Sequence, residues 1–288
     1  MNEHQKLVVL VQERLKDENI ELPVFDDIAV RLDREVRENK LDVSLMCNIL
    51  EEDPVLVSEL LRVANSSFFS GLTTIANIRE ASVRLGLRQI AAIVFSVSQK
   101  KMYSASKGLF KSRLDDLWSH VSAVSLGCRW VAANSGYRQL ADETFVAGLL
   151  HDVGKLSILC IIEQLAENDA SRFSNDAIDF AINELYCEHG GDLVDQWNLP
   201  ESFKTIVVQQ NDETINQYDT ILCIIRLVNK ACLLLGISDT RHINETSDDP
   251  ASALSSMPEA EYIGLTHEDI IDLLNMLGEI DEKTRRAA

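Results

Sequence analysis

Two ionisable residues, His151 and Asp152, stand side by side in the stretch FVAGLLHDVGKL, which covers residues 145 to 156. An imidazole and a carboxylate are ligands for divalent metal ions, and they also form hydrogen bonds with each other. A dipeptide this short also occurs by chance, so its meaning depends on the elements that carry it.

The residues before this pair predict a buried helix. Asp142 and Glu143 are typical of a helix N-terminus, because carboxylates suit the positive end of the helix dipole, and Gly154 is expected to end the same helix. The residues between them are apolar or small on all sides, as in a helix without a solvent-exposed face. A histidine and an aspartate at its last turn must be hydrogen-bonded or bound to a metal, since an isolated buried charge is costly. In the simplest alternative, the pair is only hydrogen-bonded and fixes helix packing.

A second histidine, His120, lies 31 residues before His151 in a predicted helix that begins near Asp115. It falls at the edge of the apolar stripe, about 60° from its centre, and Gly127 lies on the same side one heptad further on. A small residue there would let another helix approach closely. Taken alone, His120 fits a core-edge histidine with a satisfied hydrogen bond better than it fits a metal ligand.

The composition predicts an all-α protein. The chain of 288 residues is 46% hydrophobic, with 5 prolines and 12 glycines, and no long run alternates apolar and polar residues. No stretch approaches the ~18 to 20 apolar residues of a membrane span, and the N-terminus does not resemble a signal peptide. We therefore expect a cytoplasmic protein with no membrane span. Without a C-x-x-C pair, the cysteines are expected to be reduced core residues rather than zinc ligands or disulfides: Cys47, Cys128, Cys160, Cys187, Cys223 and Cys232.

The net charge of -19 is unevenly distributed. Residues 1–158 carry 19 Lys and Arg against 21 Asp and Glu, whereas residues 159–288 carry 8 against 25. A surface that binds nucleic acid independently of sequence needs the opposite sign, so we expect no such binding. The acidic second half fits a well-solvated surface, and it would repel anionic ligands unless a metal or local cations intervene.

Chain breaks and helix-start signals predict five parts. Residues 1–20 form an amphipathic helix that docks on the main body, and residues 21–112 form a set of short helices. Residues 113–236 contain the histidine-bearing helices. Residues 237–264 are polar and acidic, which predicts a linker or poorly ordered loop, and residues 265–288 form a last amphipathic helix.

Within the N-terminal part, Asp42, Asp53 and Asn77 are predicted to cap helices, because their side chains can accept hydrogen bonds from free backbone N–H groups. Between the last two caps, a polar, turn-rich loop carries Phe68 and Phe69. These aromatic residues either form a partner-binding surface or cover the core as a lid.

His120 followed by His151-Asp152 in AGLLHDVGK resembles the HD superfamily of metal-dependent phosphohydrolases. Further landmarks, over about residues 22–236, resemble the HDOD domain: Asp53-Pro54, the run from Leu60 to Ser66 with Phe68, Ile78, Leu85-Gly86 and Trp118. The resemblance implies a multi-helix, HD-domain-like bundle with an N-terminal helical sub-bundle. In it, His120, His151 and Asp152 converge.

In catalytic HD proteins, such a site binds a divalent metal through these three residues and a later aspartate. The resemblance thus implies a cofactor such as manganese, iron, nickel or magnesium, which would lower the pKa of a bound water. His151 and Asp152 point about 100° apart on an ideal helix, so a shared metal must lie near the helix end.

This sequence departs from the catalytic pattern at two places. Asn229 stands where catalytic relatives have their last aspartate, and an amide is a weaker, neutral ligand. Gln209 and Gln210 stand where other HD proteins have a pair of histidines. His189 matches a histidine of the relatives and is a candidate supplementary ligand.

Two functions are compatible with this partial site. In the first, the chain is an HDOD-type signalling or regulatory module that recognises a signalling protein partner, with Phe68 and Phe69 as candidate contacts. In the second, it is a divalent-metal-dependent phosphohydrolase acting on a nucleotide or phosphoester, with Asp152 in the reaction and Lys155 near the phosphate.

Overall fold

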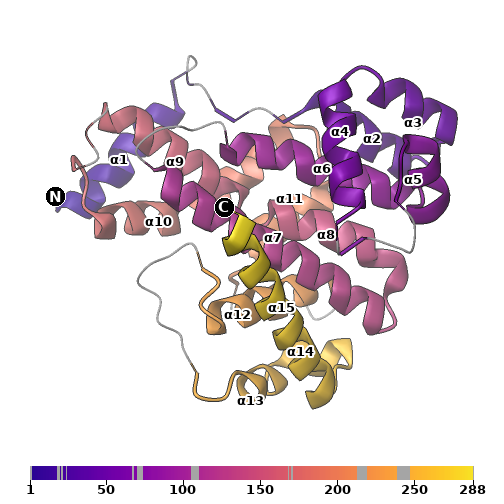
Figure 1. Ribbon diagram of the computed structural model, residues 1–288. Coiled ribbons are helices and arrows are strands. Elements are labelled where there is room, and N and C mark those ends of the chain that lie inside the picture. The colour runs from indigo at the N-terminus through magenta and orange to yellow at the C-terminus, as the bar shows by residue number, and fades with distance from the viewer. Residues whose placement is uncertain are drawn as a thin grey trace. The chain divides into compact units, whose positions relative to one another are not determined.

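The computed structural model describes residues 2–17, 20, 22–23, 25–66, 68–69, 74–104, 110–167, 169, 171–212, 219–238 and 247–287. All regular elements in these residues are helices, with no strand among them, so the all-α prediction is confirmed (Figure 1). The chain forms two compact units, one from Val24–Met102 and one from Met1–Pro23 together with Tyr103–Ala288.

The unit Val24–Met102 contains helices whose starts follow from the sequence. Asp42, Asp53 and Asn77 cap helices as predicted, and their side-chain oxygens accept hydrogen bonds from first-turn N–H groups at 2.7 to 3.0 Å. The helices are α2 (Asp27–Arg37), α3 (Val43–Leu50), α4 (Pro54–Ala64), α5 (Ile78–Leu85) and α6 (Leu87–Ser104), whose last two residues belong to the other unit.

The other unit combines the first helix of the chain with its last two-thirds. α1 (Glu3–Leu15) packs on α9 (Val153–Ala166) and α10 (Asn175–Gln196) through the buried Leu7 and Val11, as its amphipathic pattern predicted (Figure 1). The remaining elements are α7 (Lys111–Asn134), η1 (Arg138–Leu140), α8 (Ala141–Leu150), α9 (Val153–Ala166), α10 (Asn175–Gln196), α11 (Glu201–Gln209), α12 (Thr220–Leu234), α13 (Pro250–Ser255), α14 (Pro258–Ile263) and α15 (His267–Ala287).

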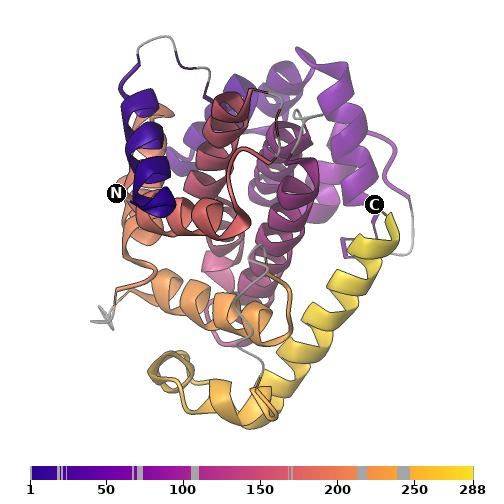
Figure 2. The ribbon, with the colours of Figure 1, turned by 90° about the vertical axis from the view of Figure 1, so that its left-hand side faces the viewer.

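Glycines let the helices around α7 approach closely. A Cβ atom added to Gly148 of α8 would lie 2.6 Å from the Cα of Ser125 in α7, so these two backbones are in direct contact. On another face of α7, a Cβ at Gly127 would lie 2.5 Å from Cγ1 of Val228 in α12. The close helix approach predicted at Gly127 is therefore present. α15, the yellow helix of Figure 2, packs on α7 as well.

The helix break in FVAGLLHDVGKL differs from the prediction. α8 has Asp142 and Glu143 in its first turn, as expected, but it ends at Leu150 rather than at Gly154. Gly154 instead lies in the first turn of α9, where an added Cβ would be only 1.9 Å from the carbonyl oxygen of Tyr186 in α10. Gly154 thus serves helix packing and does not terminate a helix.

Part of the predicted linker 237–264 is helical. α13 and α14 pack on α12, and Glu259 of α14 is 2% exposed. Its Oε1 accepts a hydrogen bond from Nε of Arg226 in α12 at 2.8 Å. The irregular linker is therefore corrected where these two helices stand, while residues 239–246 lie outside the described residues. The five-part division as a whole stays a prediction.

One described stretch, residues 138–166, has the length and hydropathy of a membrane span. However, 94% of its apolar window is buried inside the protein, and the α8–α9 break divides it. α5 and α6 pass the same test only as a pair, and that pair is bent by 118°. Such burial is typical of core helices.

The cysteines lie inside the helical units, as predicted for core residues. Burial, together with nearby carboxylates, raises the pKa of the Cys160 and Cys223 thiols to about 11. These thiols are therefore protonated near neutral pH. Cys47, Cys128, Cys223 and Cys232 are buried, and Cys160 and Cys187 are half-buried.

A buried ion pair joins α7 to α10. The guanidinium of Arg113 donates to Asp179 and to Asn175, and the side chains of the ion pair are only 7% and 12% exposed. We expect Arg113→Met to lower the free energy of unfolding by about 3 to 5 kcal/mol, because the buried Asp179 charge loses the guanidinium of Arg113. Urea denaturation measures this loss. Lys111→Met, which breaks the exposed pair with Asp115 on the same helix, should cost about 0 to 1 kcal/mol. Equal losses in the two variants would contradict the prediction.

Candidate metal centre

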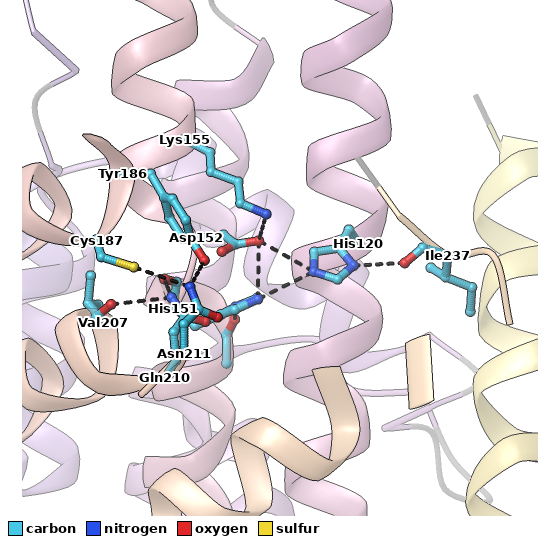
Figure 3. Close-up of polar contacts among 11 residues, drawn as sticks. His120, His151, Asp152, Lys155, Tyr186, Cys187, Val207, Gln210, Asn211 and Ile237 are labelled. Atoms are coloured by element: carbon cyan, nitrogen blue, oxygen red, sulfur yellow. Dashed lines mark hydrogen bonds and ion pairs between the residues drawn. The ribbon is translucent and has the colours of Figure 1, made fainter. Parts of the chain in front are cut away.

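His151 and Asp152 form the turn between α8 and α9. The backbone of Asp152, with φ -110° and ψ 18°, leaves the helical region and redirects the chain into α9. This break lets two consecutive side chains face the same side, which a continuous helix would not allow. In Figure 3 both side chains point toward His120 of α7.

Three ligand atoms meet at this point. The Nε2 atoms of His120 and His151 are 3.3 Å apart, and they lie 3.4 Å and 3.3 Å from Oδ2 of Asp152. All three residues are at most 1% exposed. Among the described residues, they are the group of histidine, cysteine and acidic side chains whose arrangement could hold a metal ion.

Backbone carbonyls determine which imidazole nitrogens are free for a ligand. Nδ1 of His120 lies 2.8 Å from the carbonyl oxygen of Ile237, and Nδ1 of His151 lies 2.7 Å from that of Gly148. A carbonyl oxygen can only accept, so each Nδ1 carries a proton and donates it. Nε2 is therefore the nitrogen that each imidazole turns toward the centre, as in metal-binding histidines.

The donor set fits a divalent metal. The three ligand atoms lie 3.3 to 3.4 Å from one another, so a positive charge must lie among them, and a proton on an imidazole or a divalent metal supplies it. Metal–ligand bonds of roughly 2.0 to 2.2 Å place neighbouring ligand atoms about 3 to 3.5 Å apart, which agrees with these separations. In addition, Oδ1 of Asp152 is buried and accepts no hydrogen bond from a described residue.

Lys155, one turn into α9, supplies a positive charge at the edge of this centre. Its Nζ lies 2.8 Å from Oδ2 of Asp152 and 5.0 Å from the centre of the Tyr186 ring. Burial by itself would raise the pKa of Asp152. The charges of His151 and Lys155, with hydrogen bonds from both histidines, outweigh burial and hold that pKa well below its usual value. Asp152 is thus an ionised carboxylate.

The other candidate residues lie at different places. Nε2 of His189 forms a 2.8 Å hydrogen bond with the hydroxyl of Ser157, and His189 is not in the three-residue group. Asn229 lies on α12, and its Oδ1 is buried without a hydrogen-bond partner among the described residues. Phe68 is 38% exposed and stacks edge-to-face on Phe69, with ring centres 4.9 Å apart.

Some groups at the site had no functional role in the sequence analysis. The side-chain amide of Gln210, which is 5% exposed, donates to the backbone carbonyl of His151 and so holds the turn. Asn211 donates to the Tyr186 hydroxyl (Figure 3). The carbonyls of Gly148 and Ile237 orient the histidines, but any residue has a carbonyl, so no sequence signal could identify them.

The helical fold and its buried His-His-Asp group define a class of protein with a candidate metal centre at a helix break. The sequence profile of the HDOD domain family matches residues 22–213, and the chain belongs to this family. The resemblance inferred from the sequence landmarks is confirmed.

Two solved structures have a similar fold. An HDOD domain protein of unknown function from Geobacter sulfurreducens has a TM-score of 0.78 and 22% identity, with 97% of each chain covered. A candidate metal-dependent phosphohydrolase from Shewanella amazonensis SB2B has a TM-score of 0.72 and 19% identity, with 98% of this chain and all of the other covered. An uncharacterised protein of Treponema pallidum is 24% identical over 202 residues, which are 68% of this chain and 38% of that protein. The chain therefore spans well under half of this relative.

Proposed function

We propose that this chain is an HDOD-type regulatory module that holds a divalent metal at His120, His151 and Asp152. The convergence of three buried acceptor atoms within 3.4 Å supports the proposal most directly. The Nδ1 hydrogen bonds of both histidines direct their Nε2 atoms to this point, and the carboxylate is ionised. When bound, a divalent metal would supply a Lewis acid that polarises a ligand oxygen or a water.

The burial of the site favours a regulatory role over hydrolysis. His120, His151 and Asp152 are each at most 1% exposed, whereas a phosphoester must reach a catalytic metal together with a water. Asn229 also replaces the carboxylate that catalytic relatives use, which reduces the negative charge available to the metal. In this proposal, the output passes to a signalling protein partner, and the exposed Phe68 is a candidate contact.

A divalent-metal phosphohydrolase is the second candidate function. It is favoured by Lys155, whose ammonium group lies beside Asp152 and could bind a phosphate oxygen of a nucleotide or another phosphoester. His189 is then a candidate supplementary ligand in the same helical unit, although its Nε2 forms a hydrogen bond with the Ser157 hydroxyl.

Metal content and turnover of the purified protein separate these functions. We expect near-stoichiometric manganese, iron, nickel or magnesium in the wild type and background metal in His120→Ala. His267→Ala is the matched control, because His267 is exposed and bonds only to Ser255 among the contacts described for it. Bound metal without hydrolysis of generic phosphoesters supports the regulatory module, and metal-dependent turnover supports the hydrolase. Background metal in the purified wild type, together with no Mn²⁺ binding by the wild type or by the neutral Lys155 variants described below, would refute the metal centre.

Asn229→Asp should raise Mn²⁺ affinity by about tenfold or more, because a carboxylate adds a negative charge where the family resemblance places a ligand. The buried, unpartnered Oδ1 of Asn229 is consistent with a ligand position. Calorimetric titration measures the change. Asn134→Asp adds the same charge at an exposed position of α7 and should leave the affinity unaltered. Equal affinities for wild type and Asn229→Asp would contradict this prediction.

A further inference from the structure

Lys155 binds the same carboxylate oxygen that faces the two histidines. Its Nζ is 2.8 Å from Oδ2 of Asp152, and this Oδ2 lies 3.3 to 3.4 Å from both Nε2 atoms. A metal held by the three residues would have to bind beside this ammonium group. Two cations that share one buried carboxylate repel each other strongly, because little water screens them.

The surroundings of Lys155 offer its ammonium group another favourable place. The ring of Tyr186 in α10 also lies near Nζ, with 5.0 Å from Nζ to the ring centre, and Figure 3 shows Lys155 close to both this ring and Asp152. A cation over an aromatic face is stabilised without a carboxylate. The Tyr186 hydroxyl is held by the side-chain amide of Asn211, so the ring has a fixed position.

We propose that Lys155 is a tethered cation that neutralises Asp152 in the metal-free protein and must move away from Oδ2 when a divalent metal binds. This inference rests on the metal centre proposed above. Lys155 lies in the first turn of α9 and Tyr186 in α10, so metal entry changes a contact between these two helices. Lys155 therefore sets the metal concentration at which the centre fills, and it couples filling to the α9–α10 contact.

Metal titration of Lys155 variants of the full chain tests the competition. Lys155→Met keeps most of the side-chain volume and removes the charge, so we expect the Kd for Mn²⁺ to fall by about 10-fold to 100-fold. Lys155→Arg keeps the charge and should not tighten binding. Lys204→Met is the matched control, because Lys204 pairs with Asp195 at the surface and its loss changes the net charge equally. We expect its Kd to stay within about twofold of the wild type.

Thermal unfolding provides a second readout that does not depend on the titration. The rise in Tm on adding Mn²⁺ should be larger for Lys155→Met than for the wild type. In the variant, Lys155 no longer neutralises the Asp152 carboxylate, so the bound metal does so instead. If Lys155→Met does not fold in the absence of metal, Lys155→Gln serves in both measurements, since it is neutral yet can still donate a hydrogen bond.

The outcomes distinguish a failure of the proposed competition from a failure of the proposed metal centre. Metal binding by the wild type with equal or weaker binding by the neutral Lys155 variants overturns the competition and leaves the metal centre standing. No binding by the wild type or by either neutral variant overturns both. Binding by Lys155→Met alone, abolished when His120→Ala is added, supports the competition directly.

Discussion

Asp152→Asn should abolish metal binding and destabilise the protein at the same time. The substitution removes the only carboxylate of the three-residue group, so the Kd for Mn²⁺ should rise by about 100-fold or more. In the metal-free protein it leaves the ammonium group of Lys155, whose side chain is 11% exposed, beside a neutral amide. We expect the free energy of unfolding in EDTA to fall by about 3 to 5 kcal/mol, measured by urea denaturation.

Asp142→Asn is the matched control for this experiment. It makes the same chemical change in the first turn of α8, where Asp142 lies 3.4 Å from Arg129 and the two side chains are 30% and 19% exposed. Its cost should be about 0 to 1 kcal/mol, because the pair is partly solvated. A loss for Asp152→Asn no larger than that of Asp142→Asn would show that Asp152 is not a buried, charge-paired group.

The pH dependence of the same comparison follows from the low pKa of Asp152. A carboxyl group whose pKa is lower in the folded than in the unfolded chain contributes its full stability above the unfolded pKa, roughly 3.9. That contribution is lost as the pH falls through the folded pKa, which the charges around Asp152 hold well below the ordinary value. The difference between wild type and Asp152→Asn should therefore shrink as the pH falls below about 4.

Gly154→Ala should strongly destabilise the unit that contains α9 and α10. The new Cβ would lie 1.9 Å from the carbonyl oxygen of Tyr186 and 3.0 Å from the backbone nitrogen of Gly190. Both atoms belong to the backbone of α10, so relief requires α9 and α10 to move apart. We expect a loss of about 3 kcal/mol or more in the free energy of unfolding. Because Lys155 and Tyr186 stand on these helices, metal affinity should also change.

Gly278→Ala tests whether that loss comes from packing or from the general effect of the substitution. Gly278 lies in α15, and nothing comes within 4 Å of an added Cβ. There, alanine should stabilise the helix by roughly 0.5 to 1 kcal/mol, because glycine loses more backbone entropy on folding. A Gly154→Ala protein as stable as the wild type would mean that α9 and α10 are further apart than described.

Local signals in the sequence predicted much of the helical structure. Asp42, Asp53 and Asn77 cap helices because each offers its side-chain oxygen to free N–H groups only three residues away or less. The same signal, Asp249 followed by Pro250, starts α13 inside the predicted linker. The prediction of a linker there relied on the acidic composition and did not take this helix cap into account.

Packing between distant segments could not be predicted in this way. Gly154 was interpreted as a helix stop because glycine commonly ends helices, whereas its role depends on the backbone of Tyr186, 32 residues later. The sequence spacing alone did not predict that His120 lies beside the His151-Asp152 turn. Only the family resemblance implied this proximity. The carbonyl groups that fix both imidazoles depend on where the backbone passes, which the residue types do not encode.

The position of α1 has a consequence for how the chain folds as it is synthesised. Leu7 and Val11 are buried against α9 and α10, so their partners lie between residues 153 and 196. At roughly 5 to 20 residues per second, a ribosome needs about 10 to 40 s to reach the end of α10 after completing α1. During that interval the unit Val24–Met102, which is contiguous in the chain, can fold first. The apolar stripe of α1 is still exposed to solvent at this stage. We expect α1 to be the segment of the nascent chain that binds chaperones.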